Sequence, residues 1–212
     1  MTRARRSPAT PYKLLSVLLR YPDERLAAAH DEIATAVESL RASPQRDALR
    51  DFVAHLERND PGQLAREYVE TFDLRRRSGL YLTYYAHGDT RKRGLALLRL
   101  KRLYAAAGLE LTGDELPDYL PLVLEYAALA PDGAGETLLR AHRPALELLR
   151  RGLHDIDSPY ARLLDALCTG LPRLSALERE HVRRFAEDGP PSEQVGLEPF
   201  APPEVMPVEA RA

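Results

Sequence analysis

Apolar residues recur at intervals of three and four along most of the chain, which is the spacing of one face of an α-helix. Ile33, Val37 and Leu40 form one such stripe, and Leu64, Tyr68 and Phe72 belong to another. No stretch alternates apolar and polar residues for long, as a half-buried β-strand would. The pattern therefore predicts an all-α protein, a helical bundle of about nine to ten helices.

Proline, glycine and capping residues divide this pattern into separate helices. Pro22 stops a first helix that starts near Tyr12, because the residue before proline avoids helical angles. Gly88 can adopt the left-handed angle that closes a short helix over residues 80–86, and Asp89 or Thr90 then caps a basic helix. Later helices are predicted over residues 136–151, 159–168 and 175–186.

The segment from Leu116 to Leu129 is the most densely apolar part of the chain. Leucines and tyrosines lie on all sides of a helix drawn through it, and such a helix is either buried or lines a groove. Asp118 has two interpretations here. It can be the N-cap that places Pro121 in the first turn, or it can be an anionic recognition point together with Glu125, seven residues later and about 10 Å away on the same face.

Composition divides the chain into three parts. Residues 1–10 form a basic arm, and residues 11–188 carry the helical pattern of a single domain. Residues 189–212 contain six prolines and few large apolar groups, so we predict a disordered tail. The alternative is that the scattered apolar residues of the tail dock on a groove as extended chain.

Charge is strongly segregated along the sequence. Between Arg75 and Arg102 nine residues are basic and only Asp89 is acidic, although the whole chain has a net charge of −2. Such a segment predicts a cationic surface that can bind an anionic ligand. The candidate contacts are Arg75, Arg76, Arg77, Arg91 and Arg93. The pI of about 6.3 and the lack of a recognisable reading helix argue against nucleic-acid binding, which remains the alternative function for this surface.

No residue pattern supports catalysis or a metal site. The sequence has no P-loop, GxGxxG, HExxH or GxSxG, and its six histidines are dispersed. Cys168 is the only cysteine, which fits a reducing compartment. No apolar run approaches the ~20 residues that cross a bilayer. We therefore predict a cytoplasmic protein without catalytic residues, metal or resident cofactor; a helical enzyme using dispersed carboxylates is the alternative.

Three short motifs resemble a known family. They are EYVETFD (Glu67 to Asp73), HGD (His87 to Asp89) followed by a basic helix with RGLALL, and LPDYLPLVLEY (Leu116 to Tyr126). In this order and at these separations they resemble the NarJ family, the assembly chaperones or delta subunits of respiratory nitrate reductase, which belong with the TorD/DmsD-type chaperones of molybdoenzymes. The resemblance covers about 60 residues strongly.

The resemblance implies an all-helical chaperone, expected to be a monomer when free, that binds the N-terminal segment of the catalytic subunit of a nitrate reductase. It would hold this partner until the molybdenum cofactor is inserted and so delay membrane docking. We expect the target to lie as a helix in a groove. The predicted target-binding residues are Glu67, Glu70, Asp118, Tyr119, Leu122, Glu125 and Tyr126. Many relatives have His where this chain has Tyr119, so no imidazole role transfers.

Overall fold

Twelve α-helices make up most of the part of the chain that the computed structural model describes, residues 11–111, 113–131 and 133–189. They are α1 (Pro11–Leu18), α2 (Glu24–Ala28), α3 (His30–Glu38), α4 (Pro44–Arg58), α5 (Pro61–Tyr68), α6 (Leu82–His87), α7 (Arg91–Ala106), α8 (Leu120–Leu129), α9 (Ala134–Ala141), α10 (Arg143–His154), α11 (Ala161–Thr169) and α12 (Ala176–Asp188). A π-helical turn, η1 (Val69–Asp73), continues α5, and a 3-10 turn, η2 (Arg76–Ser78), follows it. The prediction of an all-α protein is confirmed.

Helix starts follow the capping chemistry of the sequence. Asp23, Ser43, Asp60 and Ser175 each accept a hydrogen bond from a backbone N–H of the first turn that follows, in α2, α4, α5 and α12 respectively. These bonds satisfy donors that have no partner inside the helix. Gly88 ends α6 with φ of 55°, an angle that favours glycine, as expected.

Two predicted boundaries are wrong. The helix expected over residues 136–151 is divided in two at His142, because Pro144 lies in the first turn of α10 and cannot continue α9. The helix expected from Leu116 begins only at Leu120, since residues 117–119 form a turn that pairs with another segment. The bundle consequently has more and shorter helices in its described part than the periodicity suggested.

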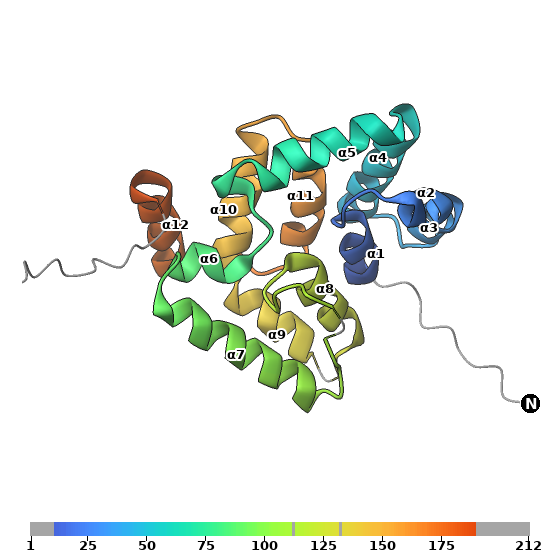
Figure 1. Ribbon diagram of the computed structural model, residues 1–212. Coiled ribbons are helices and arrows are strands. Elements are labelled where there is room, and N and C mark those ends of the chain that lie inside the picture. Colours follow the sequence, from blue (N-terminus) through green and yellow to red (C-terminus); the bar gives the residue numbers. More distant parts are fainter. Residues whose placement is uncertain (1–10, 112, 132, 190–212) are drawn as a thin grey trace, which may run out of the picture.

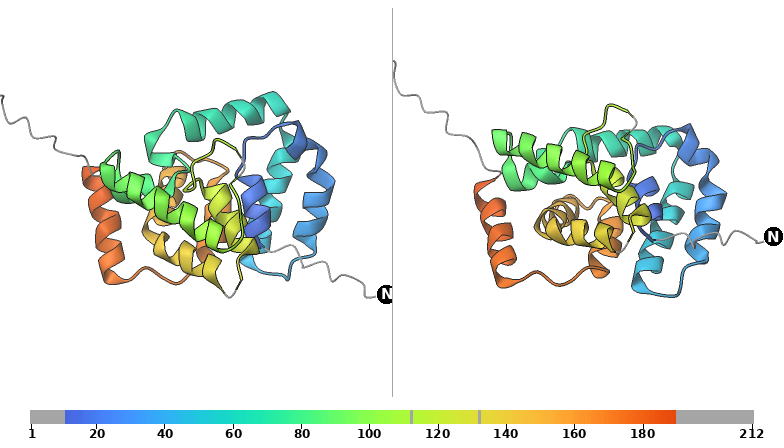
Figure 2. Two further views of the ribbon diagram at one scale, coloured as in Figure 1. Left: turned by 60° about the horizontal axis from the view of Figure 1, so that its bottom comes forward. Right: turned by 90° about the horizontal axis from the view of Figure 1, so that it is seen from below.

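The helices are arranged around α10 and α11 (Figures 1 and 2). α4 packs along α11, α1 packs along α8, and α8 packs along α9. α1 to α4 lie on one side of this centre, and α12 stands at the opposite end against α10 (Figure 2). α7 packs mainly on α6 and lies along one edge of the molecule in Figure 1.

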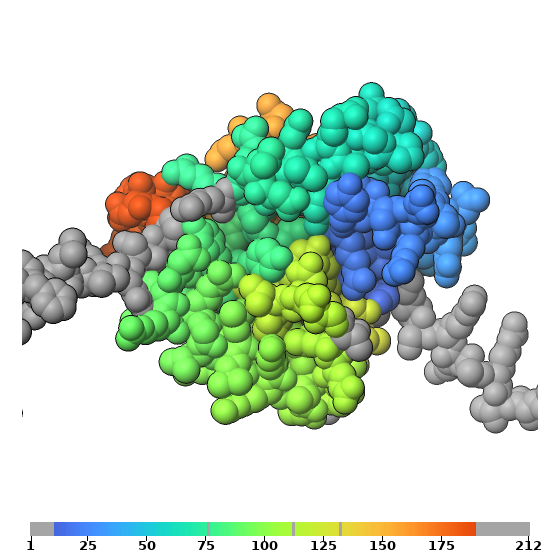
Figure 3. Space-filling view, in the orientation of Figure 1, coloured from blue at the N-terminus to red at the C-terminus, as the bar shows by residue number. Residues whose placement is uncertain are grey.

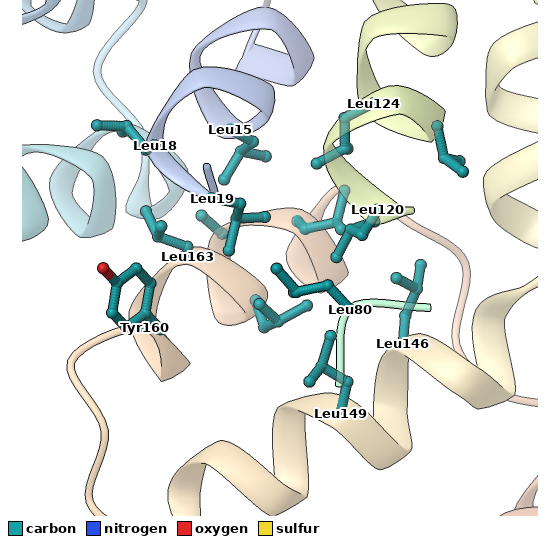
Figure 4. Close-up of a cluster of buried hydrophobic side chains, with 14 of the residues drawn as sticks. Leu15, Leu18, Leu19, Leu80, Leu120, Leu124, Leu146, Leu149, Tyr160 and Leu163 are labelled. Atoms are coloured by element: carbon teal, nitrogen blue, oxygen red, sulfur yellow. The ribbon is translucent and has the colours of Figure 1, made fainter. Parts of the chain in front are cut away.

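The core is built mainly from leucines contributed by helices distant in sequence (Figure 4). Leu15 of α1, Leu19 just after that helix, and Leu120 and Leu124 of α8 have no exposed surface. Leu80 enters from the loop before α6. Apolar side chains buried in this way supply the main favourable term in folding. The core also fixes the loop that precedes α6, which positions the candidate site described below.

The EYVETFD motif is explained largely by packing. Tyr68 and Phe72 are buried, and both rings lie against Tyr160, with centroids 5.9 and 4.8 Å away. The π-helical turn η1 inserts an extra residue at this point, and Leu74 N accordingly donates to the carbonyl of Val69 five residues before it. Single π-helical turns within α-helices occur often at functional sites.

α8 and α9 approach each other so closely that one contact position must be glycine. A Cβ added to Gly135 would lie 2.3 Å from Ala127 Cα, within the backbone of α8. Gly94 in the middle of α7 is the opposite case, because an added Cβ would meet nothing within 4 Å. The two glycines therefore offer a matched test of this packing.

We expect Gly135→Ala to lower the free energy of unfolding by roughly 1–3 kcal/mol or more, because the helices must move apart. Gly94→Ala should instead raise it by about 0.4–1 kcal/mol through the lower entropy of the unfolded chain. Urea denaturation followed by circular dichroism measures both. Equal effects of the two substitutions would contradict the close approach of α8 and α9.

A charge network anchors α10. Glu147 is 6% exposed and accepts hydrogen bonds from Arg150 Nη2 (2.9 Å) and Arg151 Nε (3.0 Å), while Arg143 Nη1 lies 3.4 Å away. Burial alone would raise the pKa of the Glu147 carboxyl, but the bonds from Arg150 and Arg151 outweigh it and lower that pKa to about 2. The folded state therefore favours the ionised carboxylate.

The pKa of Glu147 is lower in the folded protein than in the unfolded chain. Its contribution to the free energy of unfolding is therefore complete above pH ~4.5 and is lost as pH falls towards 2. We expect Glu147→Gln to reduce the free energy of unfolding by roughly 2–4 kcal/mol at neutral pH. The difference from the parent should shrink steadily as pH is lowered through this window. Glu180→Gln on the exposed face of α12 is the control and should change the unfolding free energy much less.

The predicted basic arm and proline-rich tail lie, apart from Gly189, outside the described residues. The domain boundaries at residues 10 and 189 stay predictions.

Candidate functional site

The loops that precede α6 and α8 are joined by a short backbone pairing. Leu120 N donates to the Leu80 carbonyl (2.8 Å) and Leu82 N donates to the Asp118 carbonyl (3.0 Å). This antiparallel bridge places Tyr81 opposite Tyr119, with ring centroids 5.6 Å apart. The LPDYLPLVLEY motif is thereby joined to the segment that precedes the HGD motif.

Asp118 lies at the centre of this junction and has no exposed surface. Its Oδ2 accepts hydrogen bonds from Thr83 N (3.1 Å) and Thr83 Oγ1 (2.5 Å) in the first turn of α6, and Arg93 Nη2 is 3.8 Å away. The carboxylate thus caps α6, whose N-terminal dipole favours negative charge. The interpretation of Asp118 as the N-cap of its own helix is wrong: Tyr119 occupies that position in α8, without a side-chain bond.

A groove of about 600 Å³ opens beside this junction. It lies between the end of α1, the end of α7 with the loop after it, and one face of α8. The segments around residues 20 and 110–125 adjoin on the face shown in Figure 3. Its lining residues are Arg20, Tyr21, Asp23, Tyr104, Leu109, Glu110, Leu111, Glu115, Tyr119, Leu122, Glu125, Tyr126 and Leu129.

The groove contains four of the seven predicted target-binding residues: Tyr119, Leu122, Glu125 and Tyr126. Asp118 is adjacent in sequence but has no exposed surface, and it is not among the groove-lining residues. The other two, Glu67 and Glu70, lie on α5 and η1. Glu67 pairs with His55 Nε2 (2.7 Å), and Glu70 is exposed; neither is among the groove-lining residues.

Tyrosines form the wall of the groove and are held in place by their hydroxyl groups or by stacking. The hydroxyls of Tyr119 and Tyr68 are 3.0 Å apart, and the Tyr104 hydroxyl donates to the Pro117 carbonyl (2.7 Å). Tyr126 stacks on Tyr104, with ring centroids 5.0 Å apart. Burial raises the pKa of Tyr68, Tyr104 and Tyr119, so these groups are neutral near pH 7.

The rim of the groove is mainly acidic. Asp23, Glu110, Glu115 and Glu125 outnumber Arg20. Glu125 is already paired, because Lys13 Nζ (2.5 Å) and Arg20 Nη2 (2.8 Å) both contact its carboxylate. Burial opposes ionisation of Glu125, but these two cations together lower its pKa. An apolar floor with an acidic rim matches an amphipathic segment that carries basic side chains.

The five arginines predicted to contact an anion are placed in different surroundings. Arg93 is turned towards Asp118 and Asp89, and Arg75 Nε donates to the Glu70 carbonyl (3.2 Å). Arg77 is exposed, and its carbonyl lies 2.7 Å from where a Cβ on Gly152 would be. Arg91 is exposed at the start of α7, and the side chain of Arg76 is not among those described. Their role in anion binding stays a prediction.

Sequence reasoning missed the groove residues outside LPDYLPLVLEY. Tyr21 and Asp23 come from the turn after α1, and Glu110, Leu111 and Glu115 come from the loop after α7. One available signal was the acidic cluster Glu110, Asp114 and Glu115, which lies between a basic helix and an apolar one. The spacing of apolar residues along the sequence did not indicate that Tyr21 would line the groove.

In the described part of the chain, no group of three or more His, Cys, Asp or Glu side chains is arranged to hold a metal ion. None of the helices in that part has the length and apolar character required to span a bilayer.

The fold matches that of a solved protein. A candidate redox enzyme maturation protein from Archaeoglobus fulgidus superposes with a TM-score of 0.58, covering 80% of this chain and 98% of that chain. The two sequences are 20% identical, so this likeness establishes the fold alone. This chain therefore shares the all-helical fold of that protein.

Sequence comparison defines the family. The family described as "Nitrate reductase delta subunit" matches residues 23–166, so the chain belongs to it, and the predicted NarJ resemblance is confirmed. A probable nitrate reductase molybdenum cofactor assembly chaperone, NarJ of Bacillus subtilis (strain 168), is 36% identical over 83% of this chain and 92% of its own length. The Escherichia coli (strain K12) chaperone NarJ is 38% identical over 73% of this chain and 66% of its own length.

Another relative is longer. The nitrate reductase-like protein NarX of Mycobacterium tuberculosis (strain ATCC 25618 / H37Rv) is 38% identical over 74% of this chain. The match spans only 24% of NarX, so this chain corresponds to about a quarter of that relative.

The buried junction can be tested through Asp118. We expect Asp118→Asn to lower the free energy of unfolding by roughly 1–3 kcal/mol, because the amide weakens the bonds to Thr83 and buries an NH2 group without an acceptor. Asp60→Asn is the matched control: Asp60 is the exposed N-cap of α5, and Asn caps a helix about as well as Asp. Urea denaturation of both variants measures the two changes in the free energy of unfolding. An unchanged Asp118→Asn variant would show that the junction does not depend on the charge.

Proposed function

We propose that this protein is a chaperone that binds the catalytic subunit of a nitrate reductase, mainly through the N-terminal segment of that subunit, and assists molybdenum cofactor insertion before the enzyme docks at the membrane. The proposal rests on family membership and on the names of the chaperone relatives. The observation that carries the binding mode is the groove with its tyrosine and leucine floor and acidic rim.

The groove is suited to one helical segment. A helix laid in a groove presents apolar anchors on one face, and here Leu122 and Leu129 of α8 provide the complementary surface. Basic side chains at the edge of such a segment would face Glu110 and Glu115. Glu115 already accepts a hydrogen bond from the Tyr81 hydroxyl (3.0 Å), which holds its carboxylate at the junction.

The proposed action is stoichiometric binding and not turnover. The chaperone relatives are named for assembly of an enzyme. Burial raises the pKa of the groove tyrosines Tyr104 and Tyr119, which is the opposite of the lowering that would activate them as acids or bases near pH 7. We expect the free chaperone to be a monomer that binds one target segment. In this proposal Arg75 and Arg77, which are predicted to contact an anion, form a second site that binds the phosphate of the incoming cofactor.

The groove can be tested with two exposed leucines of similar size. Leu129 is 57% exposed in the groove, and Leu177 is 81% exposed on α12, at the other end of the molecule. We expect Leu129→Asn to weaken binding of a synthetic N-terminal peptide of the catalytic subunit roughly tenfold, because an apolar anchor loses its partner. Leu177→Asn should leave the affinity unchanged.

Isothermal titration calorimetry at several temperatures measures this difference, and the parent should show a negative heat-capacity change on binding. Melting of both variants controls for folding. The groove would be the wrong site if both substitutions had the same effect on affinity. Failure of the parent to bind the peptide at millimolar concentration would contradict the proposed mode of recognition.

A further inference from the structure

α7 exposes a surface that the groove does not use. Leu95 and Leu98 are 60% and 44% exposed, although both lie within the helix. The helix packs mainly on α6 through its other face, where Leu100 and Tyr104 are buried. In Figure 1 it runs along the edge of the molecule, and Figure 3 shows its side chains on the open face.

Four of the six cations on this helix form no ion pair within the described part of the chain. Residues 90–109 contain six basic residues and no acidic one. Lys92, Arg99, Lys101 and Arg102 are exposed and form no ion pair with any other residue of the described chain. By contrast, Arg93 is turned inward, and its guanidinium lies 3.8 Å from the buried carboxylate of Asp118.

The exposed leucines and exposed cations of α7 are spaced so that they lie on one side of the helix. Arg91, Leu95, Leu98 and Arg102 are spaced by four, three and four residues, so they form one stripe along the helix. Lys92 and Arg99, seven residues apart, lie on one side of the stripe, and Lys101 lies on the other. Two leucines are therefore surrounded by cations, on a helix of 16 residues that is about 24 Å long.

We propose that α7 is a docking face for anionic phospholipid, on which the helix lies parallel to the membrane surface with Leu95 and Leu98 inserted between headgroups. Cations around an apolar centre are the pattern of helices that lie in the interface, where long basic side chains extend to the phosphates. The surface potential of anionic lipid attracts all of these cations at once and requires no fixed register.

A lipid surface fits this face better than an acidic protein does. The face is the outer side of α7, at the edge of the molecule. Within α7, Tyr104 is the first residue that lines the groove. A protein partner would need acidic groups placed opposite cations on both sides of the stripe, whereas a lipid surface supplies phosphate on every side. This inference is independent of target binding in the groove.

Vesicle sedimentation tests the electrostatic part. At low salt, the full chain should bind vesicles containing phosphatidylglycerol and not vesicles of phosphatidylcholine alone. Lys92→Gln/Arg99→Gln/Lys101→Gln should weaken binding roughly fivefold for each cation removed. The control Arg41→Gln/Arg58→Gln/Arg66→Gln removes the same charge from exposed positions outside α7 and should retain binding close to that of the parent.

Fluorescence tests insertion, because the chain has no tryptophan. The indole of Leu95→Trp should shift its emission to the blue and become protected from aqueous quenchers when anionic vesicles are added. The indole of Leu177→Trp on α12 should do neither. Melting curves and peptide titration should match the parent for all variants, which separates lipid binding from folding and from the groove.

Several results would overturn the proposal. They are no binding of the parent to anionic vesicles, equal binding to neutral vesicles, equal losses in the two triple variants, or an indole at position 95 that stays in water. Binding of the parent to polyglutamate through α7, without binding to vesicles, would assign this face to an acidic protein instead.

Discussion

The buried carboxylate of Asp118 is the constraint on which the candidate site depends. It caps α6 through Thr83 and lies within reach of Arg93, while its backbone carbonyl accepts from Leu82. Asp118 thereby connects the first turn of α6, the first turn of α7 and the loop that leads into α8. A buried carboxylate is costly unless it is hydrogen-bonded, and here the bonds are all made by Oδ2, whereas Oδ1 has no partner in the described part of the chain. The bonds to Oδ2 hold the surrounding loops in one arrangement.

The groove follows from that junction. With Asp118 fixed, Tyr119 is held opposite Tyr81 and against the hydroxyl of Tyr68, so the first turn of α8 is oriented towards α1. The carbonyl of Pro121 in that turn accepts a hydrogen bond from Ser16 Oγ of α1 (2.8 Å). The apolar surface of α8 is thus divided between the core and the groove, which explains why a helix that is apolar nearly all round need not be entirely buried.

Charge segregation in the sequence becomes two distinct surfaces in space. The groove collects carboxylates from the turn after α1, the loop after α7, and α8. The exposed face of α7 instead carries cations and leucines and no acidic residue. The two surfaces meet near Tyr104, where α7 ends. A chaperone with this arrangement can attract a basic target segment to one surface and an anionic partner to the other, without competition between them.

The sequence by itself determined the helical class, most helix boundaries and the family, because period, capping residues and short motifs are local properties. It also identified α8 as the apolar wall through Tyr119, Leu122 and Tyr126. Only the tertiary structure decided that Asp118 caps a different helix, that Glu67 pairs with His55, and that Tyr21 and Leu109 complete the groove. These relations join residues far apart in the chain, and no local pattern encodes which distant loops the leucine core will bring together.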